Sequence, residues 1–134
     1  MRTVRQVAKA ARVSVRTLHH YDAIGLLKPD HVGANGYRYY GKAELLRLQQ
    51  ILFYRELGLP LVEIAAILDD PAFDPLAALR GHRTALDARI EHYRGLIQTI
   101  DRTIASLEKD EEMQDNDYYA GIAPETRDRW QREA

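Results

Sequence analysis

A heptad repeat in the second half of the chain places the strongest constraint on its fold. Apolar residues recur there at alternating intervals of four and three, at Leu86, Ile90, Tyr93, Ile97, Ile100, Ile104 and Leu107. This spacing predicts one long helix with a continuous apolar seam, as in a coiled coil. A helix over residues 76–112 would be roughly 50 Å long, too long to bury this heptad seam against so small a domain. We therefore expect the seam to pair with a second copy of the chain; packing within a larger missing region is the alternative.

Two short helices joined by a tight turn are predicted near the N-terminus. The first covers residues 5–11, and the second begins at Ser14, whose hydroxyl can cap a helix by accepting a backbone N–H. Gly25 can adopt the left-handed conformation that ends such a helix. The second helix has one apolar face, formed by Val15, Leu18 and Tyr21. Such a pair is typical of a helix-turn-helix unit.

The opposite face of the second helix is polar and basic, with Arg16, Thr17, His19 and His20. A short helix with this surface has the size and chemistry to enter the major groove of DNA. Arg16 would meet a guanine edge or a phosphate, and a solvated arginine is the alternative. His19 and His20 diverge by about 100° on a helix, so we expect only His19 to face the groove. A zinc pair is not expected, because metal ligands on one helical face need i, i+4 spacing.

Residues 30–40 predict a β-hairpin. The Asn-Gly pair at positions 35–36 is the strongest short signal of a tight hairpin turn, and alternate side chains then face opposite ways. A hairpin directly after a recognition helix is a wing, from which Tyr37 and Arg38 can reach phosphates or a minor groove. Tyr39 and Tyr40 fit core packing as well as they fit DNA contact.

Two further amphipathic helices are predicted over residues 42–57 and 61–68. The first ends at Gly58, before Pro60. Its apolar stripe consists of Leu45, Leu46, Leu48, Ile51, Leu52 and Leu57. The inward residues of the second are Ile64, Ile67 and Leu68, followed by Phe73 as an anchor for the linker.

Charge is distributed unevenly along the chain. Residues 1–57 hold ten Lys and Arg against four Asp and Glu, a balance of +6, whereas residues 58–134 hold nine against sixteen, a balance of −7. This asymmetry indicates that the first half meets a polyanion and the second half does not. An accidental surface imbalance is the alternative.

The residue types also argue against several classes of protein. The chain has no cysteine, which excludes disulfides, thiol redox sensing and thiolate metal sites within it and fits a cytoplasmic location. No apolar run approaches the roughly 20 residues needed to span a bilayer, and the charged N-terminus does not resemble a signal peptide. Because no glycine-rich phosphate loop, acid pair or nucleophile with its base is recognisable, we do not expect an enzyme.

Three segments together resemble the MerR family of transcription regulators. They are V-S-V-R-T-L-H-H-Y-D-A-I-G-L-L-K-P (13–29), G-Y-R-Y-Y (36–40) and E-L-L-R-L-Q-Q-I-L-F-Y-R-E-L-G (44–58). With the heptad helix, the resemblance covers roughly residues 2–110. The H-H-Y-D variant of the recognition helix is most similar to the TipA-type, multidrug-responsive branch.

The resemblance implies a mainly α fold with a winged helix-turn-helix DNA-binding domain over residues 1–74. An antiparallel coiled-coil dimerisation helix would cover 75–112. Residues 113–134 would form a tail that either docks elsewhere or is the truncated start of a TipA-like effector-binding domain. The DNA-contacting residues carried over are Ser14, Arg16, Thr17, His19, His20, Tyr21, Tyr37, Arg38 and Tyr39.

The resemblance also implies a function. A homodimer would bind a palindromic site in double-stranded promoter DNA and would bend and untwist the spacer, acting as an activator that reaches RNA polymerase through the DNA. Ligand sensing in the family resides beyond the coiled coil, so we do not expect this chain to bind an effector. No cofactor and no membrane are expected.

The sequence departs from the family pattern in two places. Metal-sensing members carry cysteines near the two ends of the coiled coil, and their absence here excludes that branch and predicts no metal site. Many members cap the helix after the G-[FL] pair with Ser or Thr, whereas Pro60 and Leu61 stand here, which puts the phosphate contact of that helix in doubt. The alternative function is a coiled-coil interaction module whose basic head binds an acidic protein.

Overall fold

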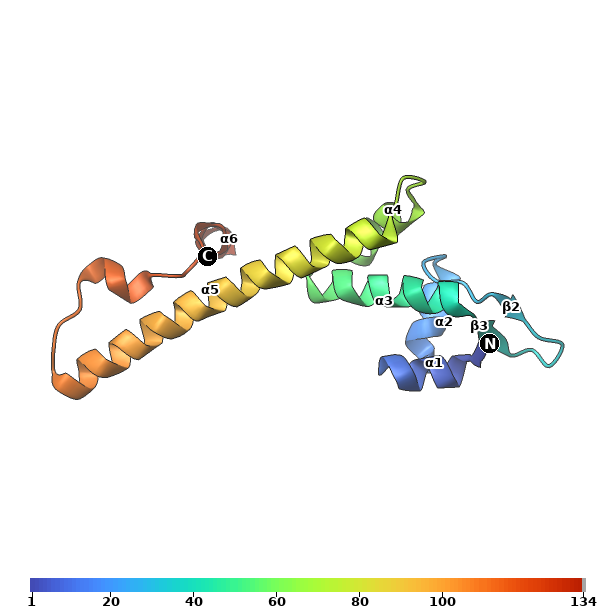
Figure 1. Ribbon diagram of the computed structural model, residues 1–134, viewed down its shortest axis with the longest axis horizontal. Helices are drawn as coiled ribbons and strands as arrows, with labels where there is room; N and C mark the ends of the chain where they lie inside the picture. Colours follow the sequence, from blue (N-terminus) through green and yellow to red (C-terminus); the bar gives the residue numbers. More distant parts are fainter. Residues whose placement is uncertain (134) are drawn as a thin grey trace. The chain divides into compact units, whose positions relative to one another are not determined.

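The computed structural model describes residues 1–133 and is mainly α-helical, with one small sheet (Figure 1). The mainly α fold predicted from the sequence, with a winged helix-turn-helix and a long helix, is confirmed. The chain forms two compact units, one from Met1 to His82 and the other beginning at Arg83. Within the described residues, none of the helices has both the length and the apolar character needed to cross a membrane.

The helix-turn-helix consists of α1 (Val4–Ala11) and α2 (Val15–Ala23). The predicted cap of α2 is present, because the Ser14 hydroxyl accepts the backbone N–H of Thr17 at 2.9 Å. The chain leaves α2 through Gly25, whose φ of +76° suits a residue without a Cβ. The start and the end of α2 therefore follow from local capping chemistry.

A three-stranded antiparallel sheet lies beside these helices, with strand order β1-β3-β2. The wing consists of β2 (His31–Val32) and β3 (Arg38–Tyr40), as the Asn-Gly turn predicts. β1 (Arg2–Thr3) pairs with the other edge of β3 and was not foreseen. Two residues are too few to show the alternation by which a strand is recognised.

One apolar core holds the first unit together. It contains Val7, Ala8, Leu18, Tyr21, Leu26, Leu27, Tyr40, Leu48, Ile51, Ile64 and Leu68. Tyr40 is fully buried, so core packing is the correct choice for this residue, and burial raises the pKa of its phenol. The aromatic ring thereby attaches the wing to the helices.

The helices α3 (Lys42–Glu56) and α4 (Leu61–Asp69) supply much of this core. Leu48 and Ile51 of the predicted stripe are buried. Leu46, however, is 39 % exposed, so its assignment to the stripe is wrong. It lies one position from Leu45, and about 100° of helical rotation turns it away from the core.

The long helix α5 (Pro75–Lys109) starts in the first unit and supplies most of the second. It ends three residues before the predicted boundary, where Asp110 adopts a φ of +54°. A 3₁₀ turn, Asp115–Tyr119, and the helix α6 (Pro124–Glu133) follow. The segment between them docks on α5 within the second unit, with the Thr99 hydroxyl donating to the Ala120 carbonyl at 2.7 Å.

Candidate nucleic-acid interface

The recognition helix α2 separates an apolar face from a polar one, as its sequence predicts. Leu18 and Tyr21 are buried, whereas Arg16, His19 and His20 are exposed. Ser14 and Thr17 are engaged with one another at the start of the helix, their hydroxyl oxygens 2.8 Å apart. The exposed face thus presents one fixed cation and two imidazoles.

His19 lies beside the wing rather than alone on the helix. It lines a hollow of about 330 Å³ with Arg5 of α1 and with Tyr37 and Arg38 of the wing. His20 does not line this hollow and instead places its ring 6.3 Å from that of Tyr21. The structure therefore brings His19, but not His20, together with the predicted wing residues.

An ion pair fixes the wing against the recognition helix. Arg38 donates from Nε to Oδ2 of Asp22 at 2.8 Å, and both side chains are partly buried. Tyr37, at the tip of the wing, is 62 % exposed. The position of the Arg38 guanidinium is therefore set in advance by the carboxylate of α2, while Tyr37 projects outward.

Tyr39 serves mainly to organise the hairpin. Its hydroxyl accepts a hydrogen bond from the Asn35 side chain at 3.0 Å, and its ring stacks on His31 with centroids 5.2 Å apart. His31 in turn lies 2.7 Å from the Asp30 carboxylate. These side-chain contacts of Tyr39 lie within the wing, and a DNA contact by this residue stays a prediction.

The hydroxyl of Tyr21 faces a second basic hollow. The ring is buried, and the hydroxyl accepts a hydrogen bond from Nη1 of Arg55 at 3.1 Å. The polar and charged residues that line this open hollow of about 670 Å³ are Arg12, Thr17, Tyr21, Arg55 and Glu56. Its two guanidiniums and two hydroxyls are groups that can donate to a phosphate oxygen, and they outnumber the one carboxylate, that of Glu56.

Sequence reasoning missed three arginines that the fold gathers around α2. Arg5 comes from α1, Arg12 from the turn, where its φ is +56°, and Arg55 from the last turn of α3. The excess of positive charge in the first half was the signal of their role. Their grouping could not be predicted, because they belong to three different elements.

The predicted heptad seam lies exposed along α5. Its seven residues, Leu86, Ile90, Tyr93, Ile97, Ile100, Ile104 and Leu107, are between 44 % and 78 % exposed. Thr99, on another face of the helix, is buried beneath the docked segment. The apolar face of α5 is thus uncovered in a single chain, while the polar Thr99 is covered.

Comparison with known families agrees with this arrangement. The chain matches the family described as "MerR HTH family regulatory protein" over residues 2–70 and the one described as "MerR, DNA binding" over residues 45–109. The two matches together cover α1 to α4 and the long helix α5.

Individual relatives are similar over most of this chain. It is 58 % identical over 123 residues to the transcriptional regulator SkgA of Caulobacter vibrioides, 48 % identical over 120 residues to the transcriptional activator mta of Bacillus subtilis, and 54 % identical over 102 residues to the transcriptional activator TipA of Streptomyces coelicolor. These matches cover 92 %, 90 % and 76 % of this chain but 48 %, 47 % and 40 % of the relatives. The chain therefore spans about half the length of the curated relatives it matches.

The crystal structure of SkgA shares the fold. It superposes with a TM-score of 0.92 and 54 % sequence identity, covering 99 % of this chain and 97 % of that one. The similarity therefore includes the docked segment and α6 as well as the helix-turn-helix.

Proposed function

Because this chain belongs to the MerR family of transcription regulators, in the branch that includes TipA, we propose that it binds a palindromic promoter site as a homodimer and activates transcription. We assign the DNA-binding domain to residues 1–74 and the dimerisation helix to 75–112, with a tail over 113–134. The observation that carries the proposal is the convergence of basic side chains on both sides of the exposed face of α2.

The two hollows support separate roles for different side chains at the DNA, some contacting base edges and others contacting phosphates. Arg16 and His19 project from α2, where they would meet base edges in the major groove. Arg38 and Tyr37 on the wing would contact the backbone on one flank, and Arg55 with the Tyr21 hydroxyl would contact it on the other. Phosphate contacts on both flanks would fix the register in which α2 reads the bases.

The exposed heptad seam supports the homodimer. Seven apolar side chains in a line are costly to leave in water, and a second α5 running antiparallel would cover them. Two copies of α2 would then stand at a fixed separation. A palindrome whose half-sites do not match that separation must be bent and untwisted, at a cost that the phosphate contacts offset.

This mechanism determines the other partners that we propose. RNA polymerase would respond indirectly, through the altered geometry of the promoter DNA. A regulator acting on promoters would work in the cytoplasm, where bacterial DNA lies. No catalytic step is required of the protein, and we propose that its relatives' role as regulators extends to it.

The salt dependence of DNA binding tests the proposal. Duplexes are first selected from a random pool by the full chain, and the dissociation constant is then measured by fluorescence anisotropy at increasing salt. A dimer with six or more phosphate contacts should lose roughly a thousandfold in affinity between about 50 and 200 mM salt. Flat affinity across this range, or no enrichment of any duplex, would favour the protein-interaction module instead.

Two arginine variants provide the matched control. Arg16→Ala should cost about 1–3 kcal/mol on the selected duplex and less on random DNA, because a base contact is lost. Arg94→Ala should leave both affinities unchanged, since Arg94 lies on α5 and pairs with Glu91 at 2.6 Å. Equal losses on both DNAs would reassign Arg16 to a phosphate.

A further inference from the structure

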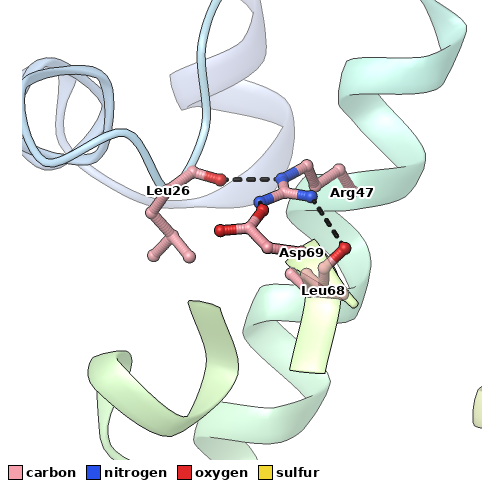
Figure 2. A network of polar contacts seen from close by, with 4 residues as sticks. All are labelled: Leu26, Arg47, Leu68 and Asp69. Atoms are coloured by element: carbon pink, nitrogen blue, oxygen red, sulfur yellow. Dashed lines mark hydrogen bonds and ion pairs between the residues drawn. The ribbon is translucent and has the colours of Figure 1, made fainter. Parts of the chain in front are cut away.

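We propose that Arg47 is a positioning residue that fixes the recognition helix α2 against the corner where α4 leads into α5. Figure 2 shows its guanidinium between the carbonyl of Leu26 on one side and Leu68 and Asp69 on the other. The inference rests on the proposed DNA-binding function and adds to it: Arg47 lines neither of the two hollows beside α2, but it sets the direction in which α2 is presented.

On the side of α2, Arg47 holds the exit of the helix. Its Nε donates to the Leu26 carbonyl at 2.7 Å. The backbone N–H groups of Leu26 and Leu27 both donate to the Tyr21 carbonyl, at 2.9 and 3.1 Å, and both side chains are buried. The Leu26 peptide is therefore tied to the last turn of α2, so a group bonded to its carbonyl is coupled to the whole helix.

On the other side, Arg47 holds the C-terminal end of α4. Nη2 pairs with the Asp69 carboxylate at 2.8 Å, and Nη1 donates to the Leu68 carbonyl at 3.4 Å. Positive charge and N–H donors are stabilising at this end of a helix, where carbonyls lack partners within the helix. The guanidinium thus bridges the ends of two helices that are separated by more than thirty residues of chain.

The connection continues from α4 into α5 through a tightly bonded turn. The Asp70 side chain accepts the N–H of Ala72 at 2.9 Å, and its carbonyl accepts the N–H of Phe73 at 2.9 Å. Asp74 then caps α5 by accepting the N–H of Leu76 at 3.0 Å. A rotation of α2 relative to the first turns of α5 would therefore have to break directional bonds.

Only arginine can make this bridge. A guanidinium presents five donors in a rigid plane, so one side chain can reach three acceptors on two elements, whereas a lysine ammonium acts as a point charge. Apolar contact, by comparison, is not directional. In a homodimer joined through α5, the angle that Arg47 fixes would set the separation of the two recognition helices.

The dependence of DNA affinity on the spacing between the half-sites distinguishes a positioning role from a merely structural one. A loss of stability alone would not change that dependence. Affinity is measured for the duplex selected by the unaltered protein and for versions whose half-sites are one or two base pairs closer or farther apart. The unaltered protein should lose about tenfold or more per altered base pair, whereas Arg47→Met should lose about threefold or less, because its recognition helices are less constrained. Arg47→Lys should fall between the two.

Two further variants keep the test decisive. Asp69→Asn leaves Arg47 and the core intact but weakens the bridge, so it should broaden the spacing profile even if Arg47→Met does not fold. Glu44→Gln is the matched control, since Glu44 lies one turn earlier on α3 and accepts the N–H of Gly41 at 2.8 Å. It should lower stability without changing the profile. If all variants gave spacing profiles parallel to that of the unaltered protein, the positioning role of Arg47 would be rejected, but the proposed DNA-binding function would stand. If no duplex were selected at all, both the proposed function and the role of Arg47 would be rejected.

Discussion

At the scale of single residues, the fold depends on a few buried polar side chains, of which His82 is the clearest. It is 5 % exposed, its Nε2 donates to Oε1 of Gln50 at 3.1 Å, and the edge of its ring meets Tyr54 with centroids 4.3 Å apart. Burial lowers the pKa of the His82 imidazole below its ordinary value of 6.5. The first turns of α5 are therefore attached to α3 by a neutral histidine.

The stability of the chain should consequently fall in mild acid. Below pH 6.5 the unfolded chain takes up a proton on His82 before the folded chain does, so the free energy of unfolding decreases as the pH falls through this range. Urea unfolding between pH 7.5 and 5.5 measures the effect. His82→Gln keeps a side chain that can bond to Gln50 but cannot titrate, and its stability should change less over the same interval. Equal slopes for the two proteins would show that His82 is not the titrating group.

At the scale of elements, α5 has two faces with different partners. The heptad seam is exposed, whereas the face with Thr99 is covered by the segment that follows α5. That contact is a close approach of two backbones, since the Cα of Gly121 lies 3.9 Å from the position that a Cβ on Gly95 would occupy. An ion pair of 3.7 Å between Arg102 and Asp117 supports it. The docked segment therefore leaves the seam free for another helix.

Glycine at position 121 should be required for this docking. A Cβ there would lie 3.0 Å from the backbone carbon of Gly95 and 3.1 Å from the nitrogen of Leu96, and the φ of +89° disfavours any side chain. Gly121→Val should cost about 1–3 kcal/mol of local stability. Hydrogen exchange of residues 115–123 would then accelerate by one to two orders of magnitude, on the order of tenfold for each 1.4 kcal/mol.

Gly95→Ala is the matched control for that experiment. A Cβ at this position makes only an ordinary contact, 3.9 Å from Gly121, and alanine favours a helix over glycine by roughly 1 kcal/mol. Exchange of the docked segment should therefore stay slow. Equal hydrogen-exchange rates of the docked segment in Gly121→Val and Gly95→Ala would show that the contact between the two backbones does not hold the segment in place.

At the scale of the whole molecule, we expect the working unit to be two chains. The basic first half and the acidic second half give each chain a strong separation of charge. Pairing through the heptad seam would join the basic first halves of two chains. The acidic excess lies outside α5, because residues 75–109 hold six Lys and Arg against four Asp and Glu.

Ile97→Asp should convert the dimer to a monomer. Ile97 stands at the middle of the seam, and an unpaired carboxylate there would be buried at the centre of the interface. Sedimentation should report half the mass, and affinity for a palindromic duplex should fall by about a hundredfold or more because the second half-site is no longer linked. Gln98→Asp adds the same charge at the exposed neighbouring position and should leave the dimer intact. A dimeric Ile97→Asp protein would refute the proposed seam.

The sequence by itself determined the features that depend on near neighbours along the chain. The cap at Ser14, the left-handed Gly25, the hairpin turn and the periodicity of α5 each involve residues only a few positions apart. A pattern of that range can be seen in the letters alone. For this reason the winged helix-turn-helix, the long helix and the exposed face of α2 could all be predicted.

Only the tertiary structure decided which distant side chains meet. Arg55 reaches the hydroxyl of Tyr21 across 34 positions, His82 reaches Gln50 across 32, and Arg47 reaches the Leu26 carbonyl across 21. Such contacts leave no periodic pattern in the sequence, because each depends on how two helices cross. The sequence therefore predicted that α2 reads DNA, and the fold decided which arginines surround it and which one holds it in place.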